Sequence, residues 1–294
     1  MTDFNSDDLF DIPAPSDAEY HENDGFNQST AWQLLSKSPR HAFEYRRKQA
    51  ERRGKTDPDH DRNREIGTVI HKLLLGSTTD FHTIVVYGKH PDDYRTKAAQ
   101  TMRAMCEARG VTPILKCDLE RCYLSVNAVR EQLADVFGIV LDGQSEQAFY
   151  WEEQGRNGKV VPCKAKLDHI RADGLTILDI KSGTDANPKG LMRRILDQGF
   201  HVQAAWYLRA LGSRNPSTIG RARFVDVFIE TTGLIMCTPV EITGSLLELG
   251  ERKRLKALAR YAECVSEGRW PGYTEQVLAP PAPEWVLKEE MAEE

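Results

Sequence analysis

The chain has 294 residues, of which 40% are hydrophobic and 28% charged, and a mean hydropathy of −0.51. This composition is typical of ordinary folded domains rather than of disordered, fibrous or membrane proteins. No apolar run approaches the roughly 20 residues of a membrane-spanning helix, and the N-terminus lacks the basic and apolar regions of a secretion signal. We therefore expect a cytoplasmic protein without membrane contact.

The six cysteines are dispersed along the chain, and no Cys-x-x-Cys pair occurs. Cys117 and Cys122 are the only closely spaced pair, which does not match the usual zinc or iron–sulfur ligand patterns. We expect reduced thiols. The sequence also lacks G-x-x-x-x-G-K-[S/T] and G-x-G-x-x-G motifs, so ATP-driven and dinucleotide chemistry have no support.

The net charge of −5 is unevenly distributed. Residues 1–28 contain eight Asp and Glu and no Lys or Arg, so taking −8 from −5 leaves +3 on the rest of the chain. We predict an acidic disordered tail over residues 1–28 and, since no later linker or repeat interrupts the sequence, one domain over residues 29–294. Solubility, masking of a basic groove and recruitment of a partner are all open as roles of the tail.

The next segments predict helices. Thr30 and Gln33 have the spacing of a capping box that opens a short helix, and Pro39 begins a second helix that runs to Gly54. A third helix is expected over residues 63–75, ending at Gly76, with an apolar stripe that contains Ile66, Val69, Ile70, Leu73 and Leu74. His71 lies at the edge of this stripe, and its position alone fits a structural histidine as well as a functional one.

Further along, we expect a strand over residues 81–86 and helices over residues 92–109 and 116–136. Near the C-terminus, Trp270 and Trp285 accompany proline-rich stretches, and we predict that both anchor this end of the chain on the core.

Residues 146–153, 160–171 and 175–181 predict three successive strands. Asp173 and Gly174 between the last two predict a two-residue type I′ hairpin turn. The register set by this turn puts Asp168 directly opposite Asp179, where Cβ atoms are about 4.5–5.5 Å apart.

Lys181 follows Asp179 by two residues and therefore points to the same face of the strand. The last strand is apolar on both faces, which predicts a buried central position. Two facing buried carboxylates are destabilising unless a cation bridges them, and carboxylate oxygens suit Mg²⁺ or Mn²⁺. A salt-bridge network without a metal is the alternative interpretation.

Three segments carry a family resemblance: IGTVIH at residues 66–71, KAKLDHI…LTILDIKSG at residues 164–183 and FHVQAAWYL at residues 200–208. Together they resemble the PD-(D/E)xK nucleases, and among these the RecE-like, exonuclease VIII proteins of phage type. The likeness runs from about Ser29 to the C-terminus. It implies an α/β fold with a restriction-endonuclease-like core, in which a central mixed sheet flanked by helices carries the catalytic carboxylates.

The resemblance also implies site residues. Metal ligands would be Asp168, Asp179, Glu146, the main-chain carbonyl of Ile180 and His71, which could instead contact the scissile phosphate. Lys181 would orient or deprotonate the attacking water, while Gln203 and Tyr207, one helical turn apart, would position the nucleic-acid strand or brace the site. Asp142 and Glu152 are alternatives to Glu146, because the turn at residues 154–158 does not fix the strand register.

The function implied is a Mg²⁺-dependent exonuclease, with Mn²⁺ able to substitute, that digests linear double-stranded DNA from 5′ to 3′. Its product would be a 3′ single-stranded tail for a single-strand annealing recombinase, and the family implies a closed homo-oligomeric ring. Two other classes are open. One is a different nuclease with this core, such as an endonuclease or a Cas4-like end trimmer, and the other is a non-catalytic DNA-binding protein on a nuclease scaffold.

Overall fold

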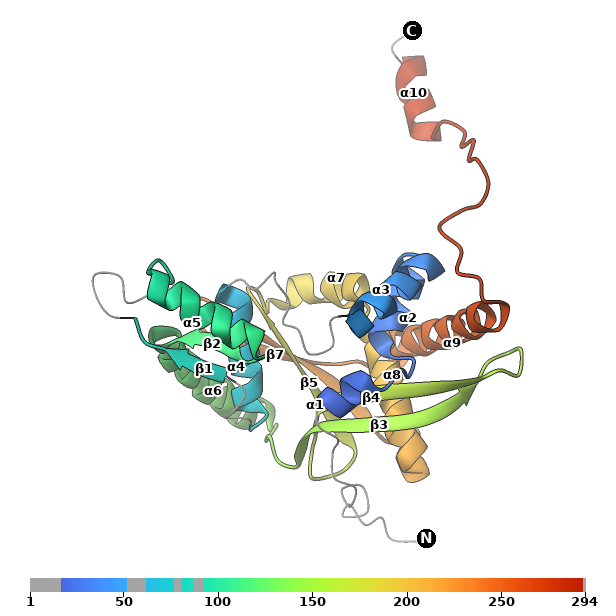
Figure 1. Cartoon of the computed structure of the whole chain (residues 1–294). Helices are drawn as coiled ribbons and strands as arrows, with labels where there is room; N and C mark the ends of the chain where they lie inside the picture. Colours follow the sequence, from blue (N-terminus) through green and yellow to red (C-terminus); the bar gives the residue numbers. More distant parts are fainter. Residues whose placement is uncertain (1–16, 52–61, 77–80, 87–92, 293–294) are drawn as a thin grey trace.

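A five-stranded mixed sheet lies at the centre of the computed structural model, which describes residues 17–51, 62–76, 81–86 and 93–292 (Figure 1). Its strands in spatial order are β3 (Gln144–Gln154), β4 (Val160–Ile170), β5 (Thr176–Gly183), β6 (Arg223–Glu230) and β7 (Cys237–Glu241). β5 and β6 pair in parallel, and their crossover contains α7 (Pro188–Gln198) and α8 (Phe200–Arg214); the other neighbours are antiparallel.

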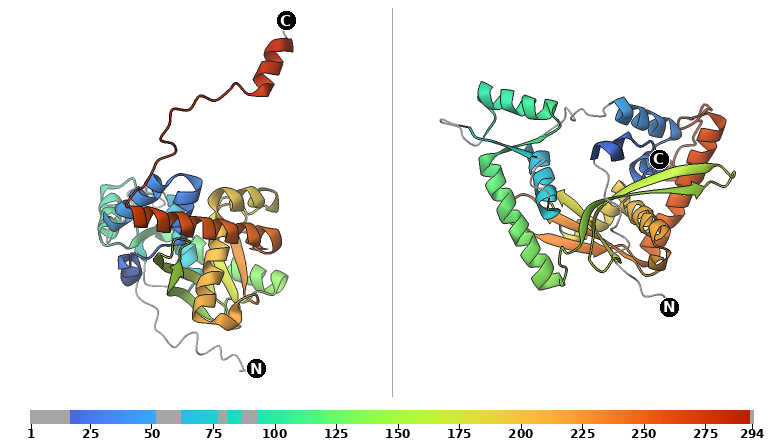
Figure 2. Two further views of the ribbon diagram at one scale, coloured as in Figure 1. Left: turned by 90° about the vertical axis from the view of Figure 1, so that its right-hand side faces the viewer. Right: turned by 60° about the horizontal axis from the view of Figure 1, so that its bottom comes forward.

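Helices cover both faces of this sheet (Figures 1 and 2). On one face, α2 (Gln28–Ser36), α8 and α9 (Gly244–Glu267) enclose a core that includes Trp206, Phe224 and Phe228. On the other face, α4 (Arg62–Leu74) and α6 (Lys116–Phe137) enclose a second core around Ile70 and Leu178. The predicted fold class, a mixed sheet flanked by helices, is confirmed.

A smaller lobe adjoins α4 and α6. β1 (Phe81–Ile84) and β2 (Thr112–Leu115) pair in parallel, and α5 (Lys97–Ala108) packs on them. β2 was not predicted, because it is only four residues long and contains Pro113, a residue that disfavours strand assignments. The helices expected on either side of it are present as α5 and α6.

The start of α2 differs from the predicted capping box. The Asn27 side chain accepts the Thr30 N–H at 2.9 Å, so the N-cap is Asn27, three residues before the predicted cap at Thr30. Thr30 itself is buried inside the helix. The second and third predicted helices are present as α3 (Pro39–Glu51), whose predicted end at Gly54 lies outside the described residues, and α4, which stops before Gly76 at φ +86°.

The predicted disordered tail is wrong for residues 17–28. Asp17–Glu22 forms α1, and Phe26 pairs with Cys163 of β4 and is fully buried. The Phe26 ring stacks on Tyr261, with centroids 4.0 Å apart, and meets Trp206 edge-on at 5.1 Å. Burial of this aromatic ring makes residues before Ser29 part of the domain; residues 1–16 lie outside the described residues.

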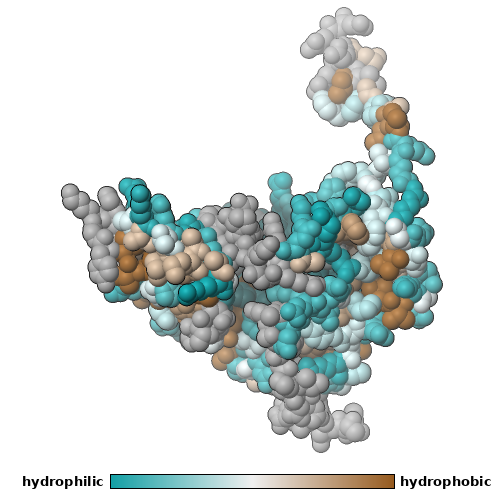
Figure 3. Space-filling view, in the orientation of Figure 1, coloured by the Kyte–Doolittle hydropathy of each residue, from teal (hydrophilic) through white to brown (hydrophobic). Residues whose placement is uncertain are grey.

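The C-terminal anchors behave differently from each other. Trp270 packs against Phe43 and Tyr261 at the edge of the first core, as predicted. Trp285, on α10 (Glu284–Ala292), is 64% exposed, so the prediction that it anchors the chain is wrong. Figures 1 and 3 show α10 at the end of an arm that leaves the body, with hydrophobic side chains along it. Within the described residues, none of the helices has the length and apolar character needed to span a membrane.

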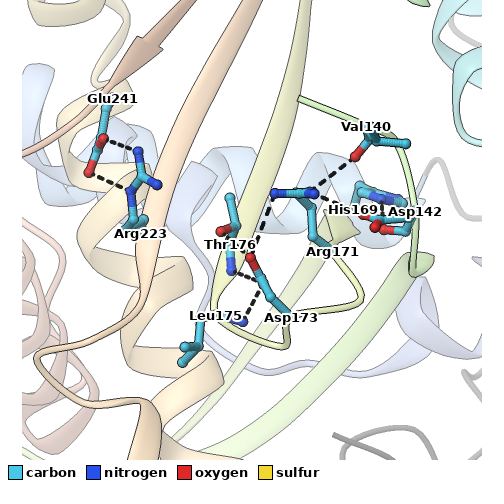
Figure 4. A network of polar contacts seen from close by, with 9 residues as sticks. All are labelled: Val140, Asp142, His169, Arg171, Asp173, Leu175, Thr176, Arg223 and Glu241. Carbon is cyan, nitrogen blue, oxygen red and sulfur yellow. Dashed lines mark hydrogen bonds and ion pairs between the residues drawn. The ribbon is translucent and has the colours of Figure 1, made fainter. Parts of the chain in front are cut away.

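The β4–β5 hairpin has the predicted register through a different turn (Figure 4). Of the residues between Arg171 and Thr176, only Gly174 has a positive φ, +63°. A type I′ turn requires two such residues, so the predicted turn type is wrong. The Arg171 N–H donates to the Thr176 carbonyl at 2.9 Å and closes a four-residue loop. The Asp173 carboxylate accepts the N–H groups of Leu175 and Thr176, each at 2.8 Å, which stabilises this loop instead.

We predict that Phe26→Ala lowers the free energy of unfolding by about 3–5 kcal/mol, because a fully buried aromatic ring leaves a cavity. Trp285→Ala is the matched control, and its exposed ring predicts a change below about 0.5 kcal/mol. Urea unfolding followed by fluorescence and circular dichroism measures both. Equal effects of the two substitutions would contradict the placement of residues 17–28 in the fold.

Candidate active site

The candidate site lies at the point where β4 and β5 separate, which we call the fork. These strands pair only through His169 with Leu178 and Ile170 with Ile177. Asp168, the next residue along β4, follows the same register and so stands across from Asp179. There the Ile180 N–H donates to Asp168 Oδ2 at 2.9 Å instead of to a backbone carbonyl. A carboxylate thus replaces one backbone acceptor at the fork.

On the other side of Asp168, the pairing of β3 with β4 is interrupted at Glu146. Pairing resumes on both sides with an unchanged register, so Glu146 stands opposite Asp168. Glu146 has φ +57° and is the single non-glycine residue with positive φ in the described part of the chain. The alternation of side chains along β4 also changes beside Glu146. Leu167 and Ile170 are three residues apart, a spacing that puts side chains on opposite faces of a regular strand, yet both pack in the first core. This local kink brings the Glu146 carboxylate beside Asp168.

α4 adds a histidine from the opposite side of the fork. A Cβ at Gly67 would lie 2.8 Å from Ser182 Oγ, so glycine permits the close approach of α4 to β5. His71 Nε2 lies 2.9 Å from Asp168 Oδ2. His71, Glu146 and Asp168 each offer a ligand atom, and these atoms lie within 4.8 Å of one another.

The protonation of these groups suits a cation site. Burial disfavours the His71 imidazolium, but the Asp168 carboxylate outweighs burial and raises the pKa of His71. Burial also opposes ionisation of Asp168, yet His71 and Lys181 hold the pKa of Asp168 below its usual value. The Glu146 carboxylate forms an ion pair with Lys166. Two carboxylates and one imidazole fit a divalent ion such as Mn²⁺ or Mg²⁺, which would displace the His71 proton and compete with Lys166.

Asp179 is held by other partners. Its Oδ1 accepts from Gln203 Nε2 at 2.8 Å, and its Oδ2 forms an ion pair with Lys181. Lys181 Nζ donates to Gln203 Oε1 at 2.7 Å and lies 4.2 Å from the centre of the Phe200 ring. Burial and the Asp168 charge raise the pKa of Asp179 to about 6. The structure therefore places Asp179 beside the His71–Glu146–Asp168 cluster, with both carboxylate oxygens engaged.

The remaining predicted residues lie around this centre. Tyr207 is half-buried one turn after Gln203 on α8, and loss of solvation, followed by the charges of Asp179 and Asp168, raises its pKa well above the usual value. It lines a cavity of about 110 Å³ together with Tyr20, Ser29 and Lys164. Ile180 contacts Asp168 through its N–H, and the role of the Ile180 carbonyl as a metal ligand stays a prediction.

The two alternatives to Glu146 lie elsewhere. Asp142 pairs with Arg171 at 3.0 Å, as Figure 4 shows, and its carbonyl contacts His169. Glu152 is exposed and lies further along the hairpin formed by β3 and β4, which we call the β3–β4 arm, opposite Pro162. Of these three acids, Glu146 is the one that the fold brings to His71 and Asp168.

Sequence reasoning missed Asp226, which pairs in register with Asp179 on the adjacent strand β6. Both Asp226 carboxylate oxygens are buried without a hydrogen-bond partner, and the Lys181 ammonium lies 3.9 Å from Oδ1. Burial raises the pKa of Asp226 to about 8, although Lys181 opposes the shift. The signal available in the sequence was a single acid within the apolar run FVDVFI at residues 224–229.

A mixed sheet that forks at facing acids, with a lysine two residues further along, defines the PDDEXK-like class of proteins. In agreement, residues 29–279 match the family described as "PDDEXK-like domain of unknown function (DUF3799)", and the chain belongs to this family. PDDEXK nucleases generally use divalent metal ions.

One solved structure has a similar fold. The crystal structure of a "Putative exonuclease" from Eubacterium rectale is similar with a TM-score of 0.59 at 12% identity, covering 94% of this chain and 98% of that one. A phage related exonuclease from Haemophilus somnus aligns with a TM-score of 0.30 at 15% identity, over 69% of this chain and 95% of that one. A search of curated proteins finds no match. The first similarity supports the fold.

We predict that Glu146→Gly is more stable than Glu146→Ala by about 1 kcal/mol, because positive φ strains any residue with a Cβ. Both substitutions remove the carboxylate and leave Lys166 without it, so the difference isolates the backbone term. Urea unfolding of the pair measures this difference. Equal stability would show that the kink at residue 146 is absent in solution.

We also predict that Mn²⁺ binds more tightly as the pH rises from about 6 to about 8. A divalent ion competes with the protons on His71, whose pKa is raised, and on Asp179, whose pKa is about 6. Each proton displaced contributes up to about tenfold in affinity per pH unit below its pKa. Calorimetry in two buffers of different ionisation enthalpy measures affinity and proton release, and His71→Gln should reduce both the affinity and its slope with pH. A pH-independent affinity would contradict this assignment.

Proposed function

We propose that this protein is a divalent-metal-dependent exonuclease that digests linear double-stranded DNA. The observation that carries the proposal is the convergence of His71, Glu146 and Asp168 within 4.8 Å, next to the Asp179–Lys181 pair. Carboxylates, an imidazole and an ammonium group around one point are the groups that phosphodiester hydrolysis requires. Membership of a PDDEXK-like family and the fold shared with a structure named as an exonuclease agree with it.

Each residue has a role that follows from its position. Asp168 and Glu146 are oxygen ligands for Mg²⁺ or Mn²⁺, His71 adds a nitrogen ligand or contacts the scissile phosphate, and Asp179 completes the set when it leaves its present partners. When bound, the divalent ion would lower the pKa of the attacking water and neutralise phosphate charge. Lys181, half-buried and kept protonated by Asp179, Asp226 and Asp168 against the effect of desolvation, supplies a positive charge beside the reacting phosphate.

The substrate has room on both sides of this centre. A cavity of about 410 Å³ opens at His71 and is lined by polar side chains that can donate hydrogen bonds to phosphate oxygens, including Asn63, Arg64, Thr68, Ser182 and Thr184. The smaller cavity at Tyr207 lies on the side of α1 and α2.

The polarity and biological setting belong to the same proposal. We infer digestion from 5′ to 3′, which leaves a 3′ single-stranded tail suited to a single-strand annealing recombinase. The resemblance of residues 66–71, 164–183 and 200–208 to RecE-like proteins supports this assignment.

The test is a degradation assay with Mg²⁺ or Mn²⁺ on linear duplex labelled at either the 5′ or the 3′ end, and on covalently closed circular duplex. We expect early release of the 5′ label, no cleavage of the circle, and at least about a hundredfold loss of rate in Lys181→Met and Asp168→Asn. Lys159→Met, at the exposed tip of the β3–β4 arm, is the matched control and should retain full activity.

Other outcomes select other functions. Cleavage of the circle would indicate an endonuclease, and early release of the 3′ label would reverse the polarity. Binding of duplex without any metal-stimulated cleavage would indicate a non-catalytic DNA-binding protein.

A further inference from the structure

Asp226 is a buried acid with no evident structural use. Its side chain is fully buried, and neither carboxylate oxygen has a hydrogen-bond partner. Buried polar groups are normally paired, because an unpaired one loses its hydration without compensation. A small apolar residue would remove this penalty at a central strand position. A costly group that is retained beside a candidate active site therefore requires a functional explanation.

The surroundings of Asp226 identify the group it serves. Asp226 and Asp179 are register partners on parallel strands and share one face of the sheet with Lys181. Among the charged groups that act on Asp226, Lys181 has the largest effect, followed by Asp179, Asp168 and Arg194. The Lys181 ammonium is 3.9 Å from Asp226 Oδ1, so a displacement of about 1 Å would bring it to hydrogen-bond distance.

Asp179 cannot bind a metal through Oδ2 while it pairs with Lys181, and Asp226 offers Lys181 another carboxylate. The two Asp179 oxygens already accept from Gln203 and from Lys181. A divalent ion and the Lys181 ammonium on the same carboxylate oxygen would repel each other strongly, so coordination through Asp179 Oδ2 requires release of that ammonium before Asp179 joins the donors of His71, Glu146 and Asp168. A lysine released in a buried site with no other acceptor would be strongly disfavoured.

We propose that Asp226 is a positioning residue that receives the Lys181 ammonium when Asp179 turns to a divalent metal. The exchange keeps Lys181 paired and charged within the site, and it frees Asp179 for coordination. This inference rests on the proposed function only in that a divalent metal binds at His71, Glu146 and Asp168. It explains why Asp226 has two free acceptor oxygens in a structure where Lys181 still pairs with Asp179.

The test measures Mn²⁺ binding by calorimetry in the absence of DNA, using the full chain. We expect Asp226→Asn to bind Mn²⁺ at least about tenfold more weakly than the wild type, because the released ammonium has no carboxylate to receive it. In the Lys181→Met background no ammonium is displaced, so the same Asp226→Asn change should leave Mn²⁺ affinity unaltered. Thermal unfolding should show Asp226→Asn to be at least as stable as the wild type, since an unpaired buried acid is removed.

Controls separate this exchange from a general structural effect. Asp118→Asn removes another buried acid, which lies on α6 and pairs with Arg62 of α4, and should lower stability without changing Mn²⁺ affinity. Asp226→Ala gives the same comparison should the asparagine variant fail to fold.

Three results would overturn the proposal. Wild-type Mn²⁺ affinity in Asp226→Asn would remove its basis, and equal weakening in both lysine backgrounds would show that Asp226 acts independently of Lys181. In either case metal-stimulated DNA cleavage by the wild type would leave the proposed function intact. Absence of Mn²⁺ binding in the wild type would instead overturn both proposals.

Discussion

The separation of β4 from β5 is the constraint from which the geometry of the site follows. Two residue pairs hold β4 and β5 together. Beyond these pairs, a continued ladder would press the carboxylates of Asp168 and Asp179 against each other. Separation instead lets the Asp168 carboxylate accept the Ile180 N–H, and it leaves space between the strands for side chains from α4 and α8. Separation of the strands thereby avoids the repulsion between the two carboxylates and leaves an opening at the centre of the sheet.

An open fork exposes backbone groups that the ladder would have paired, and other segments satisfy them. Phe26 donates its N–H to the Pro162 carbonyl at 2.8 Å and accepts the Lys164 N–H at 2.9 Å, so residues before α2 act as a short substitute strand. Trp206 Nε1 donates to the Lys164 carbonyl at 3.1 Å. The first core stabilises this arrangement through the rings of Phe26, Trp206 and Tyr261. The fork is therefore maintained by contacts from the N-terminal segment and α8, both remote in sequence from the hairpin.

Local sequence signals predicted much of this geometry, and non-local contacts account for what they missed. Asp173 and Gly174 give the hairpin register, because a glycine with positive φ and an aspartate that caps backbone N–H groups favour a tight turn even though its type is not I′. The stripe of α4 likewise places His71. No local pattern reports that Phe26 will fill a gap between strands, or that Glu146 will adopt a left-handed conformation, since both depend on the packed fork. Trp285 was predicted wrongly because an aromatic residue favours burial only where a core lies within reach.

The acids at the fork stand in one row across four strands: Glu146, Asp168, Asp179 and Asp226. The first three are compensated in turn by Lys166, His71 and Lys181, whereas the Lys181 ammonium lies 3.9 Å from Asp226, beyond hydrogen-bond distance. Three cationic partners occupy three of the four acids, so a divalent ion can join this row only if the partners rearrange. Lys181 lies between two carboxylates and can move from one to the other without leaving the site. In the proposed metal site, the unequal pairing of the row, rather than any single ligand, would therefore allow the centre to receive a metal ion.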